Sequence, residues 1–96
     1  MNFKLNAVHF SADKKLVDFV QDKVNKLGLM SDQIISGEVF LRIDKNDNGN
    51  KIAEVKILMP GSELFAKKQC KSFEEATDSA VDALKKQIEK YKAKVA

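Results

Sequence analysis

The 96-residue sequence has very little of the chemistry that most enzymes use. It contains one histidine, His9, and one cysteine, Cys70, so it has neither a Cys-x-x-Cys pair nor a group of residues at metal-ligand spacing. Its four glycines stand singly and form no phosphate-binding loop. We therefore expect a protein that is not an enzyme, holds no metal or cofactor and has no small-molecule substrate.

Long apolar runs are also missing. No stretch approaches the roughly 20 apolar residues that a membrane-spanning helix needs. Lys4, His9 and Asp13 interrupt the N-terminal segment where a signal peptide would be continuously apolar. Cys70 cannot form an internal disulfide, and it lies in an expected strand as a reduced, half-buried thiol. These features indicate a soluble, cytoplasmic protein with no membrane partner.

Charged residues are plentiful but nearly balanced. The chain has 17 basic and 14 acidic residues, which gives a net charge of +3. A hydrophobic content of 44% suffices for one modest core but not for two, so we expect a single domain over residues 1–96. The placement of the charges is therefore more informative than their total.

Apolar residues alternate with polar ones in four segments, as in strands with one buried face. These segments are residues 2–8, 37–44, 51–59 and 63–71. Between the second and third, Asn48-Gly49 favours a type I′ hairpin turn. Between the third and fourth, Pro60-Gly61-Ser62 favours another turn.

Two further segments, residues 11–28 and 72–95, repeat apolar residues at helical spacing. Asp13 or Ser11 can cap the first helix, Gly28 can end it, and Ser72 can cap the second. The order is then β-α-β-β-β-α, an α+β fold. Because a strand-helix-strand crossover is right-handed, we expect parallel first and second strands, with both helices on one face of a four-stranded sheet.

The lysines are distributed unevenly around both predicted helices. At about 100° per residue, Lys86, Lys90 and Lys94 share a flank of the second helix that has no acidic residue, whereas the opposite flank mixes both signs. A flank of the first helix carries Lys15, Phe19, Lys23 and Lys26. If these basic flanks face one groove, they would follow a phosphate backbone. Alternatively, the lysines complement the helix dipole and keep the surface solvated.

The opening MNFKLNAVHFSADKKLVDFVQDKVNKL resembles the start of the ribosome hibernation promoting factors and ribosome-associated inhibitors, the sigma-54 modulation protein / S30EA family. In that family a short strand and a polar turn precede a helix with a Lys-x-x-Lys-Leu-like ending, here Lys23, Lys26 and Leu27. The segment AVDALKKQIEKYKAK is similar to the family's final helix. The resemblance covers the whole chain and implies the same β-α-β-β-β-α fold, which is like that of double-stranded-RNA-binding domains.

The resemblance implies that the chain binds the small ribosomal subunit, its 16S rRNA and ribosomal proteins, in the channel for messenger and transfer RNA. It implies inhibition of translation in idle, stressed or stationary-phase cells, by a short form of the family that is a monomer off the ribosome. The family's basic sites fall on Lys23, Lys26, Lys86, Lys90 and Lys92. The chain departs from the family at Ala83, where a basic residue is common, and at Ser72-Phe73-Glu74, which replaces an Asp-Met-Tyr-like helix entry.

Two other functions remain open on the residues alone. One is a general structured-RNA-binding domain. The other is a protein-interaction module that uses the exposed sheet face, where Phe40 and Phe65 are expected to point away from the helices.

Overall fold

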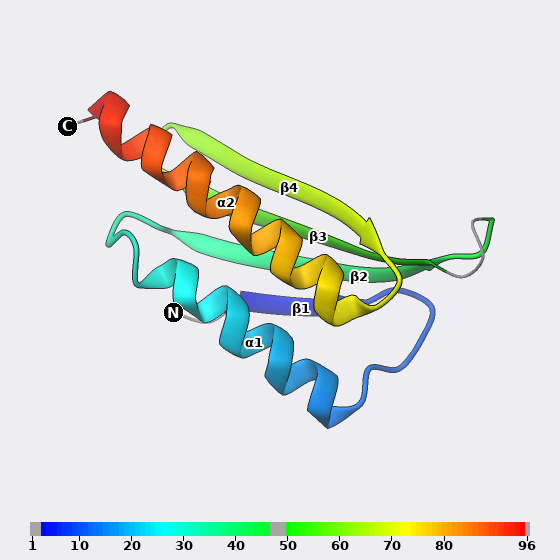
Figure 1. Ribbon diagram of the computed structural model, residues 1–96. Coiled ribbons are helices and arrows are strands. Elements are labelled where there is room, and N and C mark those ends of the chain that lie inside the picture. Colours follow the sequence, from blue (N-terminus) through cyan, green and yellow to red (C-terminus); the bar gives the residue numbers. More distant parts are fainter. Residues whose placement is uncertain (1–2, 47–49, 96) are drawn as a thin grey trace.

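The computed structural model describes residues 3–46 and 50–95 and shows the order β-α-β-β-β-α (Figure 1). The predicted α+β class is confirmed, and most element ends lie within one residue of the predicted positions. The Asn48-Gly49 turn lies outside the described residues. The elements are β1 (Phe3–Ala7), α1 (Lys14–Gly28), β2 (Ser36–Asp44), β3 (Asn50–Met59), β4 (Ser62–Cys70) and α2 (Phe73–Val95).

The four strands form one sheet in the order β1-β2-β3-β4. β1 is parallel to β2, as the crossover rule predicts, and the two later pairs are antiparallel. Both helices cover the same face of the sheet and run side by side in the same direction (Figure 1). The C-terminal halves of α1 and α2 therefore lie at the same end of the molecule.

Local polar residues define where the helices begin. The Asp13 carboxylate accepts a hydrogen bond of 2.8 Å from the backbone N–H of Leu16, and the Ser72 hydroxyl accepts one of 3.1 Å from that of Glu75. Each bond satisfies a backbone donor that the first helical turn leaves without a partner. Asp13 and Ser72 are thus the N-caps, as predicted, and α1 ends at Gly28.

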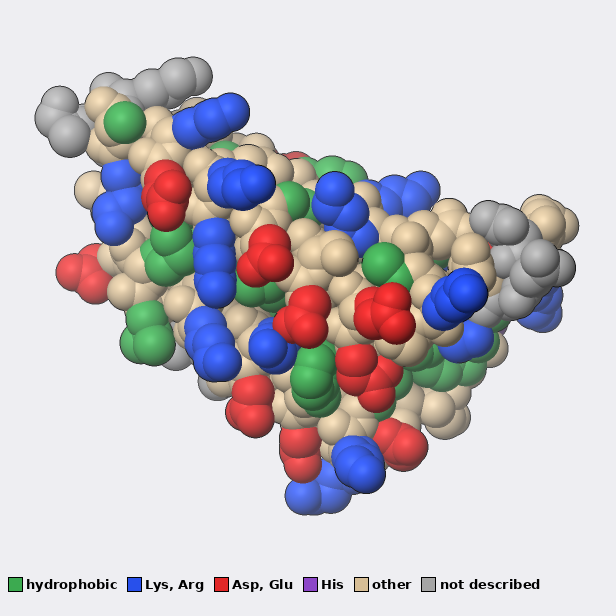
Figure 2. Space-filling model, viewed as in Figure 1, with side chains coloured by type: hydrophobic (Ala, Val, Ile, Leu, Met, Phe, Trp, Pro, Cys, Tyr) green, Lys and Arg blue, Asp and Glu red, His purple; other side chains and the backbone are tan. Residues whose placement is uncertain are grey.

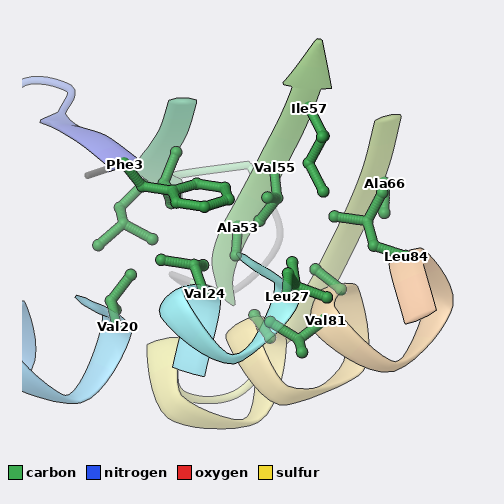
Figure 3. Packing of buried hydrophobic residues seen from close by; sticks show 14 of the residues in the cluster. Phe3, Val20, Val24, Leu27, Ala53, Val55, Ile57, Ala66, Val81 and Leu84 are labelled. Carbon is green, nitrogen blue, oxygen red and sulfur yellow. The ribbon is translucent and has the colours of Figure 1, made fainter. Parts of the chain in front are cut away.

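The hydrophobic core fills the space between the helices and the sheet (Figure 3). Val24 and Leu27 of α1, Val55 of β3 and Leu84 and Ile88 of α2 are all fully buried. Burial of each such side chain is worth about 1.5–3 kcal/mol, whereas an exposed ion pair is worth about 0–1 kcal/mol. The core therefore holds the helices in place, and surface lysines can be changed without unfolding the domain.

Two local features of the backbone affect how neighbouring elements pack. The ring of Phe3 fills the space that a Cβ on Gly37 would need, so glycine lets this ring pack over the sheet where the two residues pair. His9 has a φ of 62°, in the left-handed region that few non-glycine residues adopt. The next residue, Phe10, stacks on Phe73 at the start of α2, with ring centroids 5.0 Å apart.

Each edge strand is also bonded to the helix beside it. The Gln21 amide of α1 donates to the carbonyl oxygen of Phe3 in β1 at 3.2 Å. The Gln87 amide of α2 donates to the carbonyl oxygen of Phe65 in β4 at 2.8 Å. These bonds fix the outer flank of each helix against one edge of the sheet.

In the part of the chain that the structure describes, no helix covers the other sheet face (Figure 1). Because Val39 and Leu41 are buried in the core, the side chain of Phe40 between them points to this outer face. Phe65 does so too and is 43% exposed, which agrees with the prediction for both residues. Cys70 is half-buried in β4, also as predicted.

Candidate RNA-binding surface

On α1, Lys23 and Lys26 lie in the C-terminal half of the helix. Lys26 is exposed in the last turn, where a positive charge complements the helix dipole. Lys23 is more enclosed: its ammonium lies 3.0 Å from a carboxylate oxygen of Asp78 on α2 and 5.5 Å from the centre of the Phe19 ring. The charge of Lys23 is therefore partly neutralised by α2.

On α2, the three predicted lysines are all exposed but differ in their partners. The Lys92 ammonium donates a 2.6 Å hydrogen bond to the carbonyl oxygen of Met30, just beyond α1. Within residues 3–46 and 50–95, Lys86 and Lys90 have no ion pair or hydrogen bond. The side chain of Lys94, the third residue of this predicted flank, lies outside the described side chains.

These contacts show which side of α2 each lysine occupies. The bonds of Asp78 and Lys92 orient the mixed-charge flank toward α1. The bond of Gln87 orients the flank with Lys86 and Lys90 toward β4. The two basic flanks therefore do not line one groove, because the basic flank of α2 does not face the basic flank of α1.

The structure instead has two separate surfaces that carry lysines. The interhelical surface runs along the facing flanks of the helices and consists of Lys23, Lys26, Lys85 and Lys92 with the acidic Asp78 and Glu89. The second surface, on the far side of α2, includes Lys86 and Lys90. Figure 2 shows lysines across the C-terminal halves of both helices, whereas acidic side chains gather over the first turns of α2.

The outer sheet face is the alternative candidate site. Phe65 and Leu58 are 43% and 41% exposed there, while Phe40 is half-buried. Arg42 and Glu54 form an ion pair across β2 and β3 on the same face. This face therefore mixes exposed apolar side chains with paired charges.

Metal-binding chemistry is not apparent in the described ranges: no three His, Cys, Asp or Glu side chains there are grouped so that they could hold an ion. Neither helix of the described chain is long and apolar enough to cross a membrane.

Residues 3–96 match the family described as Sigma 54 modulation protein / S30EA ribosomal protein. The chain belongs to this family. The resemblance seen in the two terminal segments is thereby confirmed, and the family match extends through the strands between them.

Relatives within this family are distant in sequence, and two of the three described here are similar in length to this chain. The ribosome hibernation promoting factor of Acinetobacter guillouiae is 27% identical over 99 residues, covering 96% of this chain and 88% of that protein. The factor of the same name from Pseudomonas putida is 24% identical over 94 residues, covering 98% and 89%. The ribosome hibernation promotion factor of Deinococcus radiodurans is 25% identical over 95 residues, and this chain spans 49% of its length.

Solved structures share the S30EA fold. The N-terminal domain of Thermus thermophilus Protein Y superposes with a TM-score of 0.81 at 25% identity, covering 95% of this chain and 99% of that one. A ribosomal subunit interface protein from Coxiella burnetii superposes with a TM-score of 0.86 at 22% identity, covering 97% and 99%. These likenesses confirm the predicted element order.

In this S30EA family member, the exposed lysines were predictable from the sequence, but their partners were not. The ion pair between Lys23 and Asp78 and the bond from Lys92 to Met30 join residues 55 and 62 positions apart. No local spacing signals such contacts. One indication was local: at helical spacing, Asp78 and Lys92 both fall on the mixed-charge flank of α2.

Proposed function

We propose that this protein is a ribosome hibernation factor that binds the small ribosomal subunit in the channel for messenger and transfer RNA. Bound there, it inhibits translation in idle or stressed cells. The family match over residues 3–96 carries the proposal. The names of relatives in three bacterial species, which are ribosome hibernation promoting or promotion factors, support it.

The lysines supply the binding chemistry in this proposal. Lys23, Lys26, Lys86, Lys90 and Lys92 contact phosphates of the 16S rRNA, and each neutralised phosphate releases counterions. Five such contacts would make log K fall with log salt at a slope of about −3.5 to −4.5. Folded rRNA is recognised by shape and backbone, which suits lysines held on a rigid pair of helices.

Inhibition requires only occupancy of the channel. A domain bound where messenger and transfer RNA sit excludes both by its volume, so no covalent step is needed. In this proposal the protein is a binding protein that uses no metal, cofactor or small-molecule substrate. It acts in the cytoplasm, where ribosomes are, and is a monomer when it is not bound to them.

Sedimentation with ribosomal particles tests this function. The purified protein is pelleted with small subunits, with intact ribosomes and with an unrelated structured RNA, each at low and near-physiological salt. Saturable pelleting with small subunits at near-physiological salt, without pelleting by the unrelated RNA, is the expected result. Equal and salt-sensitive binding to all three would favour a general RNA-binding domain instead.

The outer sheet face offers a second candidate function, a protein-interaction module. The 43% exposure of Phe65 beside Leu58 is the observation that favours it. Phe40→Gln with Phe65→Gln tests it: loss of ribosome association in this variant, with association retained after reversal of the helix lysines, would favour the module over the lysine surfaces.

A further inference from the structure

Edge strand β4 carries two exposed lysines, Lys67 and Lys68, that the family resemblance did not assign. Because side chains alternate along a strand, Lys68 lies on the helix side of the edge and Lys67 on the outer side. In the part of the chain that the structure describes, neither lysine has an ion pair. Glu54 lies opposite Lys67 in the sheet, but its carboxylate is paired with Arg42.

The basic flank of α2 is held against this same strand. The 2.8 Å bond from Gln87 to the carbonyl oxygen of Phe65 joins the two elements. Lys86 precedes Gln87 and Lys90 follows it by three residues, while Lys67 and Lys68 follow Phe65 by two and three. One hydrogen bond thus brings together two pairs of lysines that are far apart in the sequence.

The four lysines extend along the edge in both directions from this bond. β4 and α2 run in opposite directions (Figure 1), so Lys68 lies on one side of it and Lys90 on the other. Three strand residues span about 10 Å and three helical residues about 4.5 Å, so the row is about 15 Å long. Ser79 and Ala83, on the α2 flank between, have short side chains that leave room for a backbone to approach.

Acidic residues lie beside this row. Asp82 is one turn before Lys86, Glu89 directly precedes Lys90, and Glu63 is near the opposite end of β4 from Lys67 and Lys68. Among the described residues, none of the three forms an ion pair with a lysine of the row. The row therefore presents uncompensated positive charge to its surroundings, unlike the interhelical surface.

We propose that Lys67, Lys68, Lys86 and Lys90 form one phosphate-binding surface, the β4–α2 edge, along which a strand of structured RNA lies. The β4 lysines thereby contribute to binding beside the α2 lysines. This inference rests on the proposed function, because the RNA meant is that of the small ribosomal subunit.

The test compares two variants that remove equal charge. Lys67→Gln with Lys68→Gln changes the β4–α2 edge. Lys4→Gln with Lys56→Gln changes β1 and β3, where the two lysines flank Glu38 on the outer sheet face. For both variants and the wild type, the dissociation constant for small ribosomal subunits is measured between 50 and 300 mM salt, roughly the range in which phosphate contacts dominate.

The edge variant is expected to bind about fivefold more weakly at 0.15 M salt, with a salt slope shallower by about 1.4–1.8, as loss of two phosphate contacts requires. The control is expected to keep the wild-type slope. A wild-type slope in the edge variant, whether its affinity is unchanged or lower, would overturn the inference alone, because loss of phosphate contacts must make the slope shallower. Absence of wild-type binding to small subunits would overturn the proposed function and this inference together.

Discussion

The interhelical surface and the β4–α2 edge both present lysines, but they differ in what lies beside those lysines. On the interhelical surface, Lys23 is paired with Asp78 and Lys92 is bonded to Met30. On the edge, Lys86 and Lys90 have no such partner among the described residues. A lysine that is already bonded must give up that bond to meet a phosphate. How much positive charge a helix has available for phosphate binding therefore depends on partners from other elements, and not on lysine spacing alone.

The largest expected effect follows from reversing the uncompensated charges. Lys86→Glu with Lys90→Glu should weaken binding to small subunits by roughly tenfold or more. Lys23→Glu with Lys26→Glu should weaken the same binding by only about threefold. Fluorescence anisotropy with labelled protein measures both. Urea unfolding is the control, because Lys86 and Lys90 are exposed and their reversal should change stability by no more than about 0.5 kcal/mol. An equal or reversed order of the two losses would contradict the comparison.

A smaller effect is expected from releasing α2 from the edge strand. Gln87→Ala removes the bond to Phe65, and Gln21→Ala removes the equivalent bond from α1 to Phe3. Each change should lower the free energy of unfolding by about 0.5–1.5 kcal/mol. Only Gln87→Ala should weaken small-subunit binding, by about threefold, because only that bond aligns the edge lysines. Similar binding by the two variants would show that the alignment is unimportant.

The smallest effect should come from uncovering Lys23. Asp78→Asn removes its partner carboxylate and should raise the affinity for small subunits by about twofold, at a stability change below about 1 kcal/mol. Asp18→Asn is the matched control, because Asp18 pairs with Lys14 at 3.2 Å on α1, away from α2. If both variants raised the affinity equally, net charge alone would be responsible.

Most of the fold could be predicted because its signals are local. Alternation around Val39 and Leu41 gave the strand and its buried face, and Asp13 and Ser72 marked the helix starts. The contact of Gly37 with Phe3 could not be predicted, since it depends on the register of two strands whose paired residues are 34 positions apart. The register follows from tertiary packing, which a single sequence pattern does not encode.

The candidate site was only partly predictable, for the same reason. Exposure of Lys26, Lys86, Lys90 and Lys92 follows from the apolar stripe of each helix, which leaves the other flanks in solvent. Which flank of α2 faces α1 depends on how the two helices pack. Whether the two basic flanks share a groove therefore depends on information that the helical wheel does not contain.

Electron cryomicroscopy of the protein bound to small ribosomal subunits would show where the domain binds and which lysines contact rRNA. We expect density for the domain in the channel for messenger and transfer RNA. We also expect the ammonium groups of Lys86 and Lys90 to lie within about 4 Å of rRNA phosphate oxygens. Density outside the channel, or an orientation in which Phe65 and Leu58 face the subunit while the helices face solvent, would contradict these expectations.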